Sequence, residues 1–162
     1  MKQKKTTWLI QGAVIAALYV VLTELANLLG MANGAIQIRF SEALNVLACF
    51  TSAAVPGLFI GCLLSNLLTG CVIWDVIFGS LATLLGALGA YVLRSKRIPA
   101  LVCPILSNAV IVPLVLKFAY GLPDQIWYLV LTVAVGEVIS CGVLGYLLGM
   151  VTDRYKKVLF RT

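Results

Sequence analysis

Long apolar runs separated by short polar segments dominate this sequence. The runs expected to be helical cover residues 7–30, 41–54, 56–72, 75–93, 99–119 and 126–151. A helix that crosses a bilayer needs roughly 20 apolar residues, and glycine and proline mark the breaks between such runs, at Pro56-Gly57, at residues 70–75 and in "KFAYGLPDQ". The pattern predicts an all-α membrane protein with six transmembrane helices in a single domain, residues 1–162. The second helix is short enough to be tilted or partly re-entrant.

Composition supports this assignment. Of the 162 residues, 62% are hydrophobic and 11% are charged, whereas a soluble domain has about 25% charged residues. The first run resembles a signal sequence, but further membrane sequence follows it, so we interpret it as a retained helix. We expect a multi-pass protein of the cell membrane.

The basic residues predict the orientation, because Lys and Arg gather in cytoplasmic segments. Ten of the twelve lie in three segments, the N-terminus, the loop at 94–97 and the C-terminal tail. These ten are Lys2, Lys4, Lys5, Arg94, Lys96, Arg97, Arg154, Lys156, Lys157 and Arg161. Six crossings place all three segments inside and leave Arg39 and Lys117 outside. The net charge of +6 then reflects topology, and we expect no nucleic-acid partner.

Several kinds of chemistry find no support in the sequence. There is no histidine, and the five cysteines are scattered singly through apolar stretches. Zinc, haem and His-based catalysis are therefore disfavoured. No phosphate-binding loop, nucleophile elbow or zinc-protease motif is present. We expect no enzyme activity, no metal and no cofactor in this chain.

The acidic residues provide the main clue to function. Five of the six fall on the predicted outer side, and Glu24, Glu42, Asp75 and Glu137 lie in or at helices. Charges within membrane helices are costly and usually face an interior cavity. Amide side chains lie at similar depths, at Asn27, Gln37, Asn45 and Asn108. These groups predict a polar pocket that opens outwards.

Simpler explanations exist for some of these acids. Glu42 and Asp75 stand where a carboxylate favours the N-terminus of a helix. Glu137 has a structural alternative as well, an ion pair with Arg39. Neither alternative accounts for Glu24, in the middle of its helix.

A pocket rich in carboxylates and amides suits a ligand that carries hydrogen-bond donors or a positive charge. A guanine-like edge fits, because a carboxylate accepts from a ring N–H and an exocyclic amine together. Trp74 or Tyr120 is available to stack on such a base. The pattern alone does not require this ligand.

The first helix carries small residues four apart, Ala13 and Ala17. Such spacing lets two helices approach closely. Most small-residue stripes pack within one chain, but this stripe lies in the cytoplasmic half and is a candidate docking face for another membrane protein.

Three segments, "RFSEALNVL", "AVPGLFIGCLLSNLLTG" and "WDVIFGSLATLLGA", resemble the QueT family. Its members are substrate-binding (S) components of energy-coupling factor (ECF) transporters for queuosine precursors. The resemblance extends over residues 8–150 and is densest between Arg39 and Leu85. It implies an S-component-like bundle of six helices with both termini cytoplasmic and an alanine motif in the first helix that docks on a coupling protein.

The resemblance also implies function. The partners would be a transmembrane coupling protein and two cytoplasmic ATPases, which use the ATP. The substrate would be a 7-deazaguanine, such as 7-aminomethyl-7-deazaguanine or queuine. We expect Glu42, Asp75, Asn108 and Glu137 to form the core of the site. The other expected site residues are Trp74, stacking on the base, Arg39, which orients Glu42 or gates the loop, Asn45 and Glu24.

Alternatives remain open. Families of this kind change substrate through a few pocket residues, so another vitamin such as thiamine is one alternative. A stand-alone permease with Glu137 as proton carrier is another. A membrane assembly factor is disfavoured, because a scaffold gains nothing from buried acids.

Overall fold

The protein is all-helical, as the sequence predicted. The computed structural model describes residues 2–31 and 37–160, and no β-strand occurs among them. In chain order the elements are α1 (Lys2–Leu28), the 3₁₀ helix η1 (Phe40–Cys49), α2 (Ala54–Leu68), α3 (Ile73–Val92), α4 (Arg97–Phe118), α5 (Ile126–Glu137), the π-helix η2 (Val138–Leu144) and α6 (Gly145–Leu159). Residues 32–36 of the expected outer loop, and Arg161 of the basic tail, lie outside the described residues.

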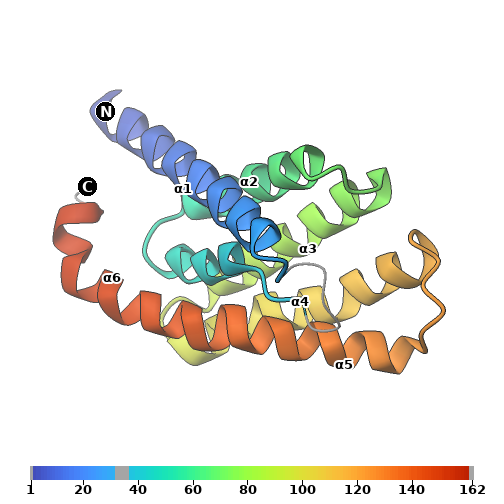
Figure 1. The fold of residues 1–162 in the computed structure, drawn as a ribbon. Coiled ribbons are helices and arrows are strands. Elements are labelled where there is room, and N and C mark those ends of the chain that lie inside the picture. Colours follow the sequence, from blue (N-terminus) through green and yellow to red (C-terminus); the bar gives the residue numbers. More distant parts are fainter. Residues whose placement is uncertain (1, 32–36, 161–162) are drawn as a thin grey trace.

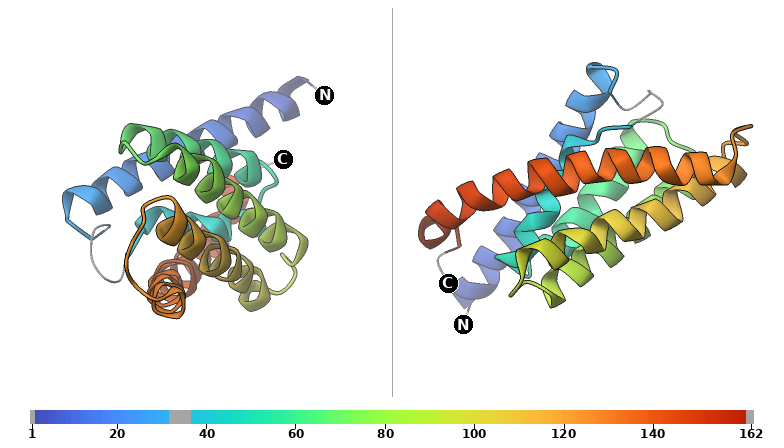
Figure 2. Two further views of the ribbon diagram at one scale, coloured as in Figure 1. Left: turned by 90° about the vertical axis from the view of Figure 1, so that its right-hand side faces the viewer. Right: turned by 90° about the horizontal axis from the view of Figure 1, so that it is seen from below.

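The helices run back and forth along one bundle. The N-terminal end of α1 and the C-terminal end of α6 lie at the same end of it (Figures 1 and 2). Helices α5, η2 and α6 follow one another without a break and form one long rod. Four helical stretches in the described part are long and apolar enough to cross a membrane, Lys5–Leu28, Ile73–Val92, Arg97–Phe118 and Ile126–Lys156. Helices η1 and α2 are apolar but shorter.

Helix η1 occupies the centre of the bundle, where it is drawn in cyan in Figure 1. It packs against α1, α3, α4, α6 and η2, and every residue from Ser41 to Ala48 is buried. The sequence pattern predicted a short helix over residues 41–54 that is tilted or partly re-entrant, and the structure shows a tighter 3₁₀ helix that ends at Cys49. The break after it covers residues 50–53, so Pro56 lies within the first turn of α2.

Small residues allow two helix pairs to pack closely. A Cβ atom added to Gly57 of α2 would lie 2.7 Å from the carbonyl oxygen of Gly12 in α1, and one at Gly61 would lie 2.7 Å from Tyr19 Cβ. On α3, a Cβ at Gly86 would lie 2.6 Å from Pro104 Cα in α4. Backbones this close leave no room for a side chain, which is how membrane helices gain packing contacts.

Two of the helices end on glycine at the end of the bundle that lies away from the termini. Gly30 and Gly70 have φ of 70° and 71°, a left-handed conformation that costs glycine little. The residue after each glycine donates its N–H back to the helix, from Met31 to Ala26 O at 3.0 Å and from Cys71 to Asn66 O at 3.0 Å. These Schellman caps end α1 and α2 and turn the chain at the rim of the cavity described next.

Candidate functional site

A polar cavity of about 710 Å³ lies where α1, α2 and α4 end and α3 begins. Its lining residues are Thr23, Glu24, Ala26, Asn27, Gln37, Arg39, Asn66, Thr69, Gly70, Cys71, Asp75, Leu116, Tyr120 and Leu122. The cavity is therefore built from the ends of four elements and from the segment that precedes η1. Two carboxylates and one guanidinium are the charged groups of this lining.

Asp75 lies in the first turn of α3 and is 4% exposed. Its Oδ2 accepts a hydrogen bond from the Tyr120 hydroxyl at 3.0 Å, whereas its Oδ1 is buried without a partner among the described residues. Its place in the first turn also suits the dipole of α3, the simpler explanation that the sequence left open. Partial burial and the neighbouring Asp75 carboxylate raise the pKa of the Tyr120 phenol, so this hydroxyl keeps its proton and donates.

Glu24 provides the second carboxylate of the cavity. It stands near the end of α1, and its Oε1 is buried without a partner among the described residues. A buried carboxylate oxygen that accepts no hydrogen bond is costly. Glu24 and Asp75 each present such an oxygen, and a ligand that carries N–H groups is able to satisfy both.

Arg39 lies between this cavity and a deeper group of polar side chains. It lines the 710 Å³ cavity and also a small inner cavity, together with Gln37, Val112, Val133 and Glu137. Its backbone N–H donates to Ser140 Oγ in η2 at 3.2 Å. Among the described residues, no ion pair joins Arg39 to Glu137. The structural alternative for Glu137 is therefore not observed.

The deeper group centres on Glu42, which is 1% exposed. Its Oε1 accepts a short hydrogen bond from the Tyr19 hydroxyl. Its Oε2 accepts from Asn45 Nδ2 at 2.7 Å and from Asn108 Nδ2 at 3.4 Å. Both oxygens of Glu42 are thus occupied by donors of the protein. Glu42 is also the acidic residue in the first turn of η1, so it keeps the position near a helix N-terminus that favours a carboxylate.

Glu137 joins the same group from the last residue of α5. The Cys141 thiol donates to Glu137 Oε2 at 3.3 Å and to the Glu42 backbone carbonyl at 3.3 Å. Glu42, Glu137 and Cys141 place one ligand atom each within 4.8 Å of one another, a spacing that a metal ion would accept. Hydrogen bonds from three protein donors already satisfy Glu42, so the group does not require a metal. The expectation of no metal stays a prediction.

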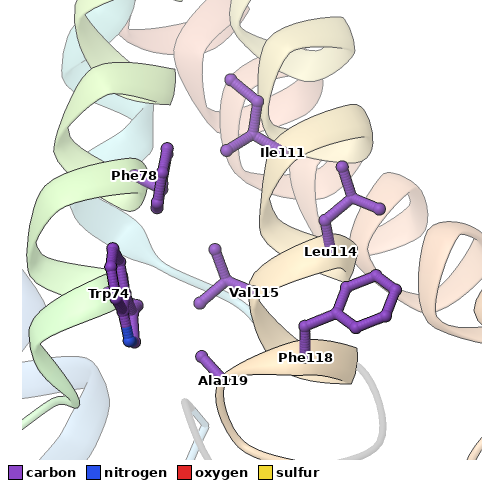
Figure 3. A pocket seen from close by; sticks show the side chains of 7 residues that line it. All are labelled: Trp74, Phe78, Ile111, Leu114, Val115, Phe118 and Ala119. Atoms are coloured by element: carbon purple, nitrogen blue, oxygen red, sulfur yellow. The ribbon is translucent and has the colours of Figure 1, made fainter.

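Trp74 does not line the polar cavity, and its expected stacking on a base stays a prediction. Its ring is 55% exposed and lies beside Phe78, in an apolar groove between α3 and α4 (Figure 3). Successive residues of a helix point about 100° apart, so Asp75 facing the cavity turns Trp74 away from it. Tyr120, the alternative stacking residue, does line the cavity.

Several residues of the site gave no signal in the sequence. Tyr19 and Cys141 resemble ordinary residues of apolar helices, yet both contact Glu42. Asn66 lines the cavity and donates weakly to the Asp75 carbonyl at 3.4 Å. Gly136 lies against the backbone of Gln37, so that a Cβ there would be 2.2 Å from the Gln37 carbonyl oxygen. A glycine beside Glu137 was the only available sign of this contact.

The two alanines of α1 face outwards. Ala13 and Ala17 are exposed, whereas Ala16 is buried and its carbonyl oxygen would lie 3.0 Å from a Cβ at Gly61. The alanine face and the face that packs on α2 are thus different sides of the helix. Ala13 and Ala17 remain available to a partner.

Comparison with known proteins gives the family. A family model described as "QueT transporter" matches residues 9–154. A curated relative from Lactococcus lactis subsp. cremoris (strain MG1363), named "Queuosine precursor transporter QueT", is 44% identical over 85 residues, which are 52% of this chain and 49% of the relative. The match thus spans about half the length of that relative. No solved structure matches the chain.

These matches agree with what the sequence suggested. A transporter family and several long apolar helices confirm the expectations of a multi-pass membrane protein and of a protein that is not an enzyme. The segments from Arg39 to Leu85 that carried the resemblance lie within the matched range. Because the family model matches residues 9–154, nearly the whole of this chain, the chain belongs to the QueT transporter family.

Proposed function

We propose that this chain is the substrate-binding subunit of an ECF-type importer and captures a queuosine precursor from outside the cell. Family membership and the name of the Lactococcus relative support a queuosine precursor as the substrate. The polar cavity at one end of the bundle supports a binding role. Its two unpartnered carboxylate oxygens, on Glu24 and Asp75, are the observation that carries the proposal.

A 7-deazaguanine offers what these oxygens lack. The ring N–H and exocyclic amine of a guanine edge suit one carboxylate, and the ammonium of 7-aminomethyl-7-deazaguanine suits the other. Arg39, which also lines the cavity, is a donor for the base carbonyl. Tyr120 is positioned to contact the base from the end of α4.

Glu42, Asn45, Asn108 and Glu137 form a second layer of the proposed site. They lie behind Arg39, where Glu137 shares the small inner cavity with it. Movement of Arg39 on binding would open this layer to the ligand. Of the expected site residues, Trp74 is the one that we leave out of the proposal.

The proposed topology has six crossings with both termini in the cytoplasm. The start of α1, the α3–α4 turn and the end of α6 lie at the same end of the bundle (Figure 1), and this end holds Arg94, Arg97 and Lys156. The positive-inside rule places it in the cytoplasm. Helix η1 would then cross as a short helix buried among longer neighbours, and α2 as a short helix with an exposed apolar face.

The importer requires partners that this chain does not contain. We propose that Ala13 and Ala17 dock on a transmembrane coupling protein, because they form an exposed face of small residues. Two cytoplasmic ATPases would supply the energy. No cofactor is proposed for the chain itself.

Ligand binding to the purified subunit tests the proposal. Calorimetry with 7-aminomethyl-7-deazaguanine, its cyano analogue, queuine, guanine and thiamine should show saturable binding of one deazaguanine. Binding should be weakened in Asp75→Asn and unchanged in Asp124→Asn, since Asp124 lies outside the cavity lining. Binding of thiamine alone, or of none, would refute the substrate. Uptake that persists in cells without the ATPases would instead identify a stand-alone permease.

A further inference from the structure

A second polar cavity, of about 540 Å³, lies at the end of the bundle opposite the proposed substrate site. The α3–α4 turn, the end of η1 and the end of α6 enclose it. Its lining includes Arg94, Arg97 and Lys156, against a single acid, Asp153. Three cations and one anion give this lining a charge of +2 (3 − 1).

The internal contacts use only part of this charge. Asp153 forms an ion pair with Arg97 and lies 3.8 Å from Lys156 Nζ. The Arg94 guanidinium lies 4.2 Å from the centroid of the Tyr91 ring, and no ion pair joins it to an acid in the part of the chain that the structure describes. Arg94 and Lys156 are thus held near one another with positive charge in excess.

Helix α4 adds a further positive feature. It begins at Arg97, which lines the cavity, and its N-terminus has no side-chain cap. The uncapped N–H groups and the helix dipole favour an anion at this end. Ser95, in the turn before the helix, also lines the cavity and brings a hydroxyl donor.

The surroundings of the cavity point to a lipid. Residues that flank its lining in the chain are exposed and apolar, with Val92 75%, Ile98 69% and Val158 77% exposed. A soluble anion would make no use of these side chains, whereas the acyl chains of a phospholipid pack against them. Basic pockets between transmembrane helices bind anionic headgroups in this way.

We propose that this cavity binds the phosphate-bearing headgroup of an anionic phospholipid, with Arg94 and Lys156 as the main contacts. Arg97 is held by Asp153 and shapes the wall. The site does not depend on the identity of the transported substrate, and phospholipid headgroups border both faces of a membrane.

The full chain, purified in detergent and stripped of lipid, provides the test. We expect phosphatidylglycerol to raise the midpoint of thermal unfolding and to remain bound in native mass spectrometry, and phosphatidylcholine to do neither. Each basic side chain near an anionic headgroup contributes about fivefold to binding, so Arg94→Gln with Lys156→Gln should weaken phosphatidylglycerol roughly thirtyfold. Arg94→Lys should retain it.

Arg154→Gln is the matched control, because Arg154 is exposed on the same helix and does not line the cavity. Inorganic phosphate and glycerol phosphate, tested in the same unfolding measurement, show whether a soluble anion has the effect of the lipid. Three results would overturn the proposal. They are equal binding of the two phospholipids, an equal loss of phosphatidylglycerol binding in the control variant, and stabilisation by soluble phosphate at the concentration at which the lipid acts.

Discussion

Gly136 provides a sharp test of how the proposed substrate cavity is held in shape. It lies on α5, next to Glu137, and faces the backbone of the segment that carries Arg39. A Cβ at this position would stand 2.2 Å from the Gln37 carbonyl oxygen and 3.2 Å from its carbonyl carbon. The Gly136→Ala variant therefore cannot keep the native position of this segment.

The size of the effect follows from this geometry. Carbon and oxygen atoms without a bond seldom approach within about 3 Å, so the Gln37 carbonyl must move by roughly 1 Å. Arg39 is two residues away and is tethered by its N–H to Ser140 Oγ at 3.2 Å. Overpacking of this kind costs about 1–3 kcal/mol of stability. Loss of a charged hydrogen bond from Arg39 to the ligand would cost about 1.5–3 kcal/mol, or roughly tenfold to a hundredfold in affinity.

Two measurements on the purified chain separate these effects. The unfolding midpoint in detergent reports the strain without reference to any ligand, and calorimetry with the preferred deazaguanine reports the cavity. Gly142→Ala is the matched control, because a Cβ there meets only Val138 Cγ1 at 3.7 Å and Ile105 Cδ1 at 3.9 Å, ordinary contacts. If Gly136→Ala unfolded and bound ligand like the control, the close contact and the argument built on it would be refuted.

Three further predictions concern the carboxylates and the alanine face. Glu42→Ala should destabilise the protein by roughly 3–5 kcal/mol, because it leaves several buried donors without an acceptor. Glu42→Gln keeps an acceptor and should cost less than about 1.5 kcal/mol. Denaturant unfolding measures both free energies, and equal costs would contradict the hydrogen-bond assignment. Asp75→Asn should weaken binding of the aminomethyl ligand by about tenfold to a hundredfold, and binding of its neutral cyano analogue by less. Calorimetric titration measures both dissociation constants, and an equal loss for the two ligands would contradict a contact between Asp75 and the ammonium group. Ala13→Leu with Ala17→Leu should leave binding to the isolated subunit unchanged and abolish uptake in cells that contain the whole importer, whereas unchanged uptake would show that this face docks nothing.

The helical class was predictable because the apolar runs leave few alternatives. The ends of α1 and α2 were also visible as glycines, and Gly30 and Gly70 have the positive φ that such ends require. The local helix type was not predictable. An apolar run such as residues 40–49 has the same pattern whether it forms an α or a 3₁₀ helix, so the 3₁₀ form of η1 gave no signal in the sequence. The π-helix after Glu137 gave no signal for the same reason.

The candidate site was predictable as a set of residue types and not as an arrangement. Depth along a helix follows from counting residues, which placed Glu24 and Asp75 towards one end, where the cavity lies. Which side of a helix faces the cavity depends on neighbours that sequence does not reveal, and Trp74 therefore lines the apolar groove between α3 and α4 and not the polar cavity. Tyr19 was missed because a tyrosine in an apolar helix shows nothing of the acid that its hydroxyl meets.

The arginine and glutamate at the start of η1 can now be given different roles. Burying the Glu42 carboxylate is costly, and the donors of Tyr19, Asn45 and Asn108 offset that cost while they tie α1, η1 and α4 together. The cavity acids are satisfied only in part, since Glu24 and Asp75 each keep one buried oxygen without a partner among the described residues. A carboxylate that is already satisfied gains little from a ligand, whereas an unsatisfied one gains a full hydrogen bond. We therefore propose that Glu42 acts first as a fixed support beside Arg39, and that Glu24 and Asp75 would supply the binding energy for a cationic base.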